Sequence, residues 1–77
     1  MITIELIDKY SELTRRIQAH AIEQAWSLDW TQFAKYRRGE SEARSAGNLR
    51  TALRNLGEMI ALLGVAARFH RKTSHAV

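Results

Sequence analysis

The sequence predicts an all-α fold of two or three helices in a hairpin-like bundle, and three observations support this prediction. The chain has 77 residues with no proline and only four glycines, so few residues interrupt a helix. Apolar residues recur at the spacing of an amphipathic helix over most of the chain. In the C-terminal half they form a heptad pattern of more than three repeats. At this length we expect a single helical domain, residues 1–77.

The first helix is expected at about residues 3–26. Its apolar residues form one stripe, opposite a charged side that includes Asp8, Glu12 and Arg16. The stripe consists of Leu6, Tyr10, Leu13, Ile17 and then His20 or Ala21. The alternating run at residues 2–7 is typical of a short strand, but a lone strand has no sheet to join. We therefore expect this run to form the first helical turn.

A shorter second helix is expected at about residues 28–38. Ser27 is a suitable N-cap because its hydroxyl accepts a backbone N–H bond, and Asp29 suits the positive end of a helix. Gly39 is expected to end the helix, since glycine adopts the left-handed conformation without steric cost. The segment also contributes to an aromatic stripe, for which we favour packing in the core over contact with a partner: Trp26, Trp30 and Phe33.

The third helix is expected at about residues 40–72, with a frayed tail at residues 73–77. Its apolar residues repeat at positions a and d of a heptad, and small or apolar residues flank them where charges are usual. We therefore expect this seam, over residues 46–70, to join copies of the chain in a homo-oligomer. The predicted oligomer interface consists of Leu49, Leu53, Leu56, Gly57, Ile60, Leu63, Gly64 and Ala67.

The length of the third helix has a consequence for its surroundings. A helix over residues 40–72 would be about 50 Å long, whereas a compact domain of this size spans roughly 30 Å. Either the helix breaks near Gly47 or a second subunit covers the part that projects. A second apolar stripe on the opposite side is covered by the first helix or, failing that, binds a partner: Leu62, Val65 and Phe69.

The run Leu49-x-x-x-Leu53-x-x-Leu56-Gly57-x-x-Ile60-x-Leu62-Leu63-Gly64 resembles the oligomerisation helices of small phage DNA-packaging subunits. The resemblance covers about sixteen residues and rests on leucine and glycine alone, and the N-terminal half lacks the expected DNA-binding domain. It implies an assembly or packaging subunit, which is one alternative for the function.

Composition excludes several classes of function. Without cysteine the chain has no disulfide framework, no cysteine-based zinc site and no thiol nucleophile, and we expect a cytoplasmic protein. Its longest nearly apolar run, residues 59–67, is about half of what a membrane-spanning helix needs, so no membrane partner is expected. A hydrophobic core in so short a chain rarely supplies more than about 3–5 kcal/mol. This is a further reason to expect a homo-oligomer.

No arrangement of residues in the sequence indicates an enzyme. A general acid–base pair needs two titratable groups in one cleft, and the acidic residues of the first helix are better explained as a solvated side. His20 and Glu23 stand in the reverse order of the di-iron motif, and His70 and His75 do not share a helical face. We expect no catalytic residues, no cofactor, no metal and no small-molecule substrate.

Twelve Lys and Arg against eight Asp and Glu give a formal charge of +4, which permits contact with nucleic acid or with an acidic protein surface. The candidate binding residues lie around Gly39: Trp30, Lys35, Tyr36, Arg37, Arg38 and Arg44. Our leading hypothesis is a small non-enzymatic regulator or inhibitor, of the kind that phages and mobile elements encode, which occupies a protein partner as an oligomer. The alternative is nucleic-acid binding by the same basic turn. A solvated charged face without a partner is the third interpretation.

Overall fold

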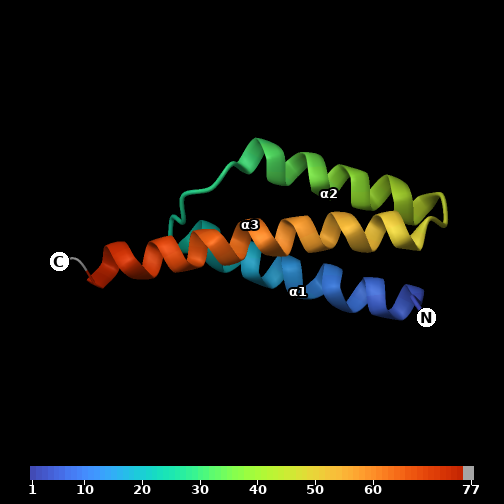
Figure 1. Cartoon of the computed structure of the whole chain (residues 1–77), viewed down its shortest axis with the longest axis horizontal. Coiled ribbons are helices and arrows are strands. Elements are labelled where there is room, and N and C mark those ends of the chain that lie inside the picture. The colour runs from blue at the N-terminus through green and yellow to red at the C-terminus, as the bar shows by residue number, and fades with distance from the viewer. Residues whose placement is uncertain (76–77) are drawn as a thin grey trace.

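A computed structural model describes residues 1–75 of the chain and the side chains of residues 1–72. This part consists of three helices without any strand: α1 (Ile4–Glu23), α2 (Trp30–Ser45) and α3 (Leu49–His75). Helix α3 lies between α1 and α2, parallel to the first and antiparallel to the second (Figure 1). The all-α fold class predicted from the sequence is confirmed.

Helix α1 begins and ends on local hydrogen bonds. The Thr3 hydroxyl accepts a bond from the backbone N–H of Leu6 at 3.2 Å, so Thr3 is the N-cap. At the other end Ala25 adopts a left-handed φ of 55°, and the N–H of Trp26 donates to the Ala21 carbonyl at 2.9 Å. This is the pattern of a Schellman motif, and it ends the helix before the predicted boundary at residue 26.

The cap of helix α2 is Asp29, and the expectation that Ser27 caps it is wrong. The Asp29 carboxylate accepts a bond from the backbone N–H of Gln32 at 3.0 Å. The chain reaches helical geometry only after the bend at residue 28, so the Ser27 side chain lies too far from the free N–H groups of the first turn.

Asp29→Ala is expected to lower the free energy of unfolding by about 1 kcal/mol, because it removes this cap. Ser27→Ala is the matched control and is expected to leave the free energy of unfolding unchanged. Urea unfolding followed by circular dichroism at the helical minimum measures both. An equal loss in Ser27→Ala would contradict the assignment of the cap.

Gly39 does not end helix α2, which continues to Ser45. A Cβ atom added at Gly39 would lie 2.8 Å from the Asn55 Oδ1 atom of α3. The amide group of Asn55 is itself held in place, because its Nδ2 donates to the Thr51 carbonyl at 2.9 Å. Gly39 therefore serves the close approach of two helices rather than a helix end.

The turn between α2 and α3 is at Gly47, where the long predicted helix breaks. Gly47 has a left-handed φ of 78°, and the N–H of Asn48 donates to the Ala43 carbonyl at 2.8 Å. The Asn48 side chain accepts a bond from the N–H of Thr51 at 3.2 Å and so caps α3. Helix α3 includes residues 73–75, where a frayed tail was expected, while residues 76–77 of that tail lie outside the described residues.

The core lies where α3 faces both of its neighbours. The buried residues of α3 occupy heptad positions d and g: Ala52, Leu56, Met59, Leu63 and Ala66. The residues at position a are only half-buried: Leu53, Ile60 and Ala67. The predicted a/d seam is therefore displaced by part of a turn. The reason is that α3 has two neighbours within its own chain, and the middle of its buried side points between them.

The molecule is elongated, with extents of 47 × 22 × 17 Å and a radius of gyration of 13.5 Å. A compact chain of this length has a radius of gyration of about 11–12 Å. The difference arises because the last turns of α3 project beyond α1 and α2 (Figure 1). Within the described part of the chain, every helix is too short or too polar to cross a bilayer.

Candidate interaction surfaces

The predicted basic cluster is distributed around helix α2 and does not form one patch. Trp30 and Tyr36 are half-buried and pack against the core, and the Trp30 ring meets Phe33 edge-on with 5.4 Å between ring centroids. Lys35 and Arg38 are exposed. The sequence predicted a turn at Gly39 that would bring these side chains together. The helix instead continues past Gly39, so its successive side chains point in different directions.

Arg44 connects α2 to α1. Its Nη1 atom lies 2.6 Å from Asp8 Oδ1 of α1, and its Nη2 atom lies 2.8 Å from Glu40 Oε1. Glu40 is only 2% exposed, so its carboxylate depends on this cation. Arg44 thus holds the bundle together, and its charge is already compensated by two carboxylates.

Arg37, by contrast, has no carboxylate bonded to it. Its Nη2 atom donates to Gln18 Oε1 of α1 at 3.1 Å, and its guanidinium carbon lies 5.8 Å from the centre of the Phe33 ring. The Nη1 atom is buried and meets no acceptor among residues 1–72. Burial lowers the pKa of Arg37 below its ordinary value, and the positive charge of Arg15 lowers it further.

Residues of α1 and α2 line an open cavity of about 420 Å³, to which Arg37 contributes. Arg15 contributes a second cation to it, although sequence reasoning assigned Arg15 no role. Periodicity could have placed Arg15 on the side of α1 that carries Gln18 and Ile22, but only the packing of α2 brings Arg37 to them. We call this cavity the α1/α2 groove; its lining residues are Arg15, Gln18, Ala19, Ile22 and Arg37.

Helix α1 turns small residues inward and leaves larger ones at the surface. Its buried residues are Ile7, Ser11, Thr14 and Ala21. The Thr14 hydroxyl donates to the Tyr10 carbonyl at 2.6 Å, which satisfies it inside the core. Tyr10 and Leu13, which the sequence placed on the packed side, are exposed. The signal that sequence reasoning missed is the pair of small hydroxyl residues, Ser11 and Thr14, which lie buried on the packed side of α1.

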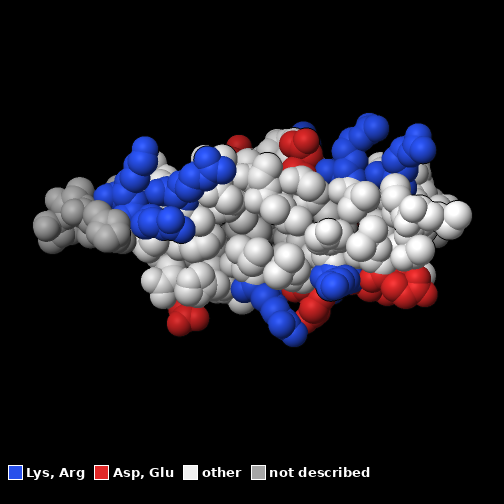
Figure 2. Space-filling view, turned by 60° about the horizontal axis from the view of Figure 1, so that its bottom comes forward, with Lys and Arg blue, Asp and Glu red and all other residues white. Residues whose placement is uncertain are grey.

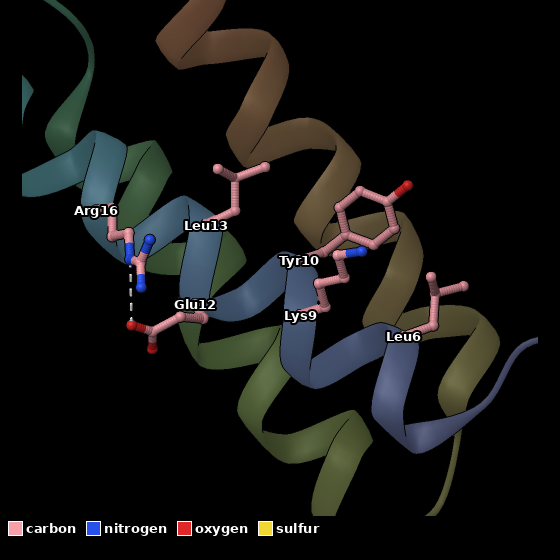
Figure 3. A pocket seen from close by; sticks show the side chains of 6 residues that line it. All are labelled: Leu6, Lys9, Tyr10, Glu12, Leu13 and Arg16. Carbon is pink, nitrogen blue, oxygen red and sulfur yellow. Dashed lines mark ion pairs between the residues drawn. The ribbon is translucent and has the colours of Figure 1, made fainter.

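The outward residues of α1 continue onto the adjacent side of α3. Figure 3 shows Leu6, Tyr10 and Leu13 on the side of α1 that is turned toward α3; together with the charged residues Lys9, Glu12 and Arg16 they line a cavity of about 330 Å³. Figure 2 shows a broad area without charges over these two helices, between rows of charged side chains. We call this surface the α1/α3 apolar face. On α1 it comprises Leu6, Tyr10 and Leu13. On α3 we assign to it Leu53, Gly57, Ile60 and Gly64, whose spacing puts them on one side of that helix, next to its buried residues.

The structure covers some residues of the predicted oligomer interface and leaves others accessible. Leu56 and Leu63 are covered by the chain's own helices, so they are not available to a second copy in this fold. Leu49 and Ala67 are half-buried, as are Leu53 and Ile60 of the apolar face. Gly57 and Gly64 leave open space, because a Cβ atom added at either would meet no atom of the described residues within 4 Å.

The second apolar stripe of α3 is not covered by α1. Val65 is 65% and Phe69 is 59% exposed, while Leu62 is half-buried against the core. These residues lie on the C-terminal part of α3, which extends past the start of α2 (Figure 1). The stripe therefore stays a candidate contact for a partner.

His20 and His70 pack against an aromatic ring. The Trp26 ring meets His20 edge-on, with centroids 5.6 Å apart, and lies 6.2 Å from the ring of His70. Among the residues that the structure describes, no three His, Cys, Asp or Glu side chains come together as a metal site would require. No family model, curated protein or solved structure matches this chain. The proposed function is therefore based on the α1/α3 apolar face and the α1/α2 groove.

Proposed function

We propose that this protein is a non-enzymatic binding module that self-associates and acts by occupying a protein partner. The α1/α3 apolar face is the observation that supports this proposal. Single exposed apolar residues are common on soluble proteins, whereas contiguous apolar areas bounded by charges are typical of interaction sites. Here Tyr10 and Leu13 of α1 are exposed, and Leu53 and Ile60 of α3 are half-buried.

A second copy of the chain is the occupant that this face favours. The core of so short a chain supplies about 3–5 kcal/mol at most, and a two-fold dimer would bury the same apolar face twice. The open space at Gly57 and Gly64 allows a neighbouring helix to approach the α3 backbone closely. The dimer would leave α2 and the α1/α2 groove accessible to the partner.

Leu13→Glu is expected to weaken self-association roughly 100-fold, because it removes about 1.5–3 kcal/mol of apolar burial and places a charge in the interface. Sedimentation velocity over a concentration series measures this change. The wild-type chain is expected to sediment as a dimer at micromolar concentrations, and the variant as a single chain.

Ile22→Glu is the matched control. Ile22 is an exposed apolar residue of the same helix, but it lines the α1/α2 groove instead of the apolar face. We expect it to leave self-association unchanged. A wild-type protein that stays a folded single chain at high micromolar concentration would contradict the proposal.

Nucleic-acid binding is a weaker candidate. Two of the four predicted cations, Arg37 and Arg44, point toward α1 and hold the helices together. Lys35 and Arg38 are the exposed pair that remains on α2. Binding that is dominated by phosphates needs several accessible cations, and its affinity falls steeply as salt rises.

A further inference from the structure

Two cations and no carboxylate are among the lining residues of the α1/α2 groove. Arg15 comes from α1 and Arg37 from α2, and between them the groove offers the neutral amide of Gln18 and the aliphatic side chains of Ala19 and Ile22. This groove lies on the other side of α1 from the α1/α3 apolar face.

The positive charge in the groove is compensated only in part: the Glu40 carboxylate acts on Arg37, but it is bonded to Arg44. Arg44, which lies further along α2, bonds to Asp8 and Glu40, whereas Arg37 bonds only to an uncharged amide; one buried nitrogen of each, Nε of Arg44 and Nη1 of Arg37, has no acceptor among the described residues. A buried cationic donor without an acceptor is unfavourable. An oxyanion in the groove would reduce the repulsion between Arg15 and Arg37, and the exposed guanidinium of Arg15 would donate to it.

We propose that the α1/α2 groove binds the carboxylate of an acidic side chain on the protein partner. A guanidinium group matches a carboxylate through two parallel hydrogen bonds. Ile22 is 62% exposed and would contact an apolar residue next to the acidic one. The groove thus recognises an acidic residue followed by an aliphatic residue.

The groove fits a peptide better than a nucleic acid. A nucleic-acid backbone presents a phosphate at every nucleotide and needs a row of cations, but here the cations form one pair. Arg44 is neutralised, and the exposed carboxylate of its partner Asp8 would repel a phosphate. This inference rests on the proposed function, since it states the chemistry of the partner.

The test uses the full chain labelled with ¹⁵N and two acetylated, amidated peptides, Ser-Glu-Leu-Ser and Ser-Gln-Leu-Ser. The Glu peptide is expected to shift the amide signals of Arg15, Ala19 and Arg37 in a saturable way. The Gln peptide is expected to bind about tenfold more weakly, because it lacks the charge. Added salt is expected to weaken only the binding of the Glu peptide.

Arg15→Gln is expected to weaken binding of the Glu peptide about tenfold. Arg16→Gln is the matched control, because Arg16 is the exposed neighbour that pairs with Glu12 at 3.5 Å on another side of α1. We expect the control to change the affinity by less than about twofold. The same spectra show that both variants remain folded.

Three results would overturn the inference: equal binding of the two peptides, an equal loss in Arg16→Gln, or preferential binding of a single-stranded oligonucleotide that depends on Lys35 and Arg38. Its failure is distinguishable from failure of the proposed function. Self-association is measured by sedimentation and depends on Leu13, and Arg15→Gln is expected to leave it unchanged.

Discussion

Leu56→Ala is expected to leave a large share of the protein unfolded at room temperature. Leu56 is 0% exposed, lies in the N-terminal half of α3 and belongs to the core cluster. Truncation of a buried leucine to alanine costs about 2–5 kcal/mol, because apolar burial is lost and a cavity remains. A core of this size supplies about 3–5 kcal/mol in total, so one substitution removes most of the stability.

Urea unfolding followed by circular dichroism measures this effect, with Val65→Ala as the control. Val65 is on the same helix but is 65% exposed, and we expect its truncation to change the free energy of unfolding by less than about 0.5 kcal/mol. Ile60→Ala is expected to fall between the two, since Ile60 is half-buried. A larger loss for Ile60→Ala than for Leu56→Ala would mean that heptad position a is packed more deeply than position d, contrary to the burial of the two residues.

Arg44→Met is expected to destabilise the protein by about 3 kcal/mol, because it leaves the Glu40 carboxylate buried without its bonded cation. We place the effect at the lower end of the range for buried pairs. The Arg44 side chain is 30% exposed, and the charge of Arg37 still acts on Glu40. Thermal and urea unfolding measure the loss.

The double variant Glu40→Leu with Arg44→Met is expected to recover most of that loss, since an apolar pair needs no counter-charge. Arg16→Met is the control for loss of a surface arginine, and it is expected to cost less than about 1 kcal/mol because its pair with Glu12 is exposed. A double variant that is no more stable than Arg44→Met alone would show that the ion pair is not the cause.

Local rules predicted the helices better than their ends. The sequence left a break near Gly47 as one of two alternatives, because glycine is unfavourable in a helix interior; the structure shows the break, with Gly47 left-handed and Asn48 as the N-cap of α3. The same rule failed at Gly39. A glycine in a helix is either an end or a place of close contact, and only the position of Asn55 distinguishes the two.

The candidate sites needed the tertiary structure. Sequence reasoning selected Arg37 but not Arg15, because Arg15 lies on another helix and no spacing rule joins the two. It also suggested an aromatic binding residue at Trp30, which the structure places against the core beside Phe33.

The sequence by itself determined that the chain is helical and that α3 is its most apolar part, because backbone propensity and hydrophobic periodicity are local properties. Only the tertiary structure decided which sides of α1 and α3 are covered. A heptad pattern marks where one neighbouring helix would lie, whereas α3 has two neighbours that share its buried side. Burial is a property of the whole arrangement, and for that reason Leu56 lies inside the chain while Leu13 remains at the surface.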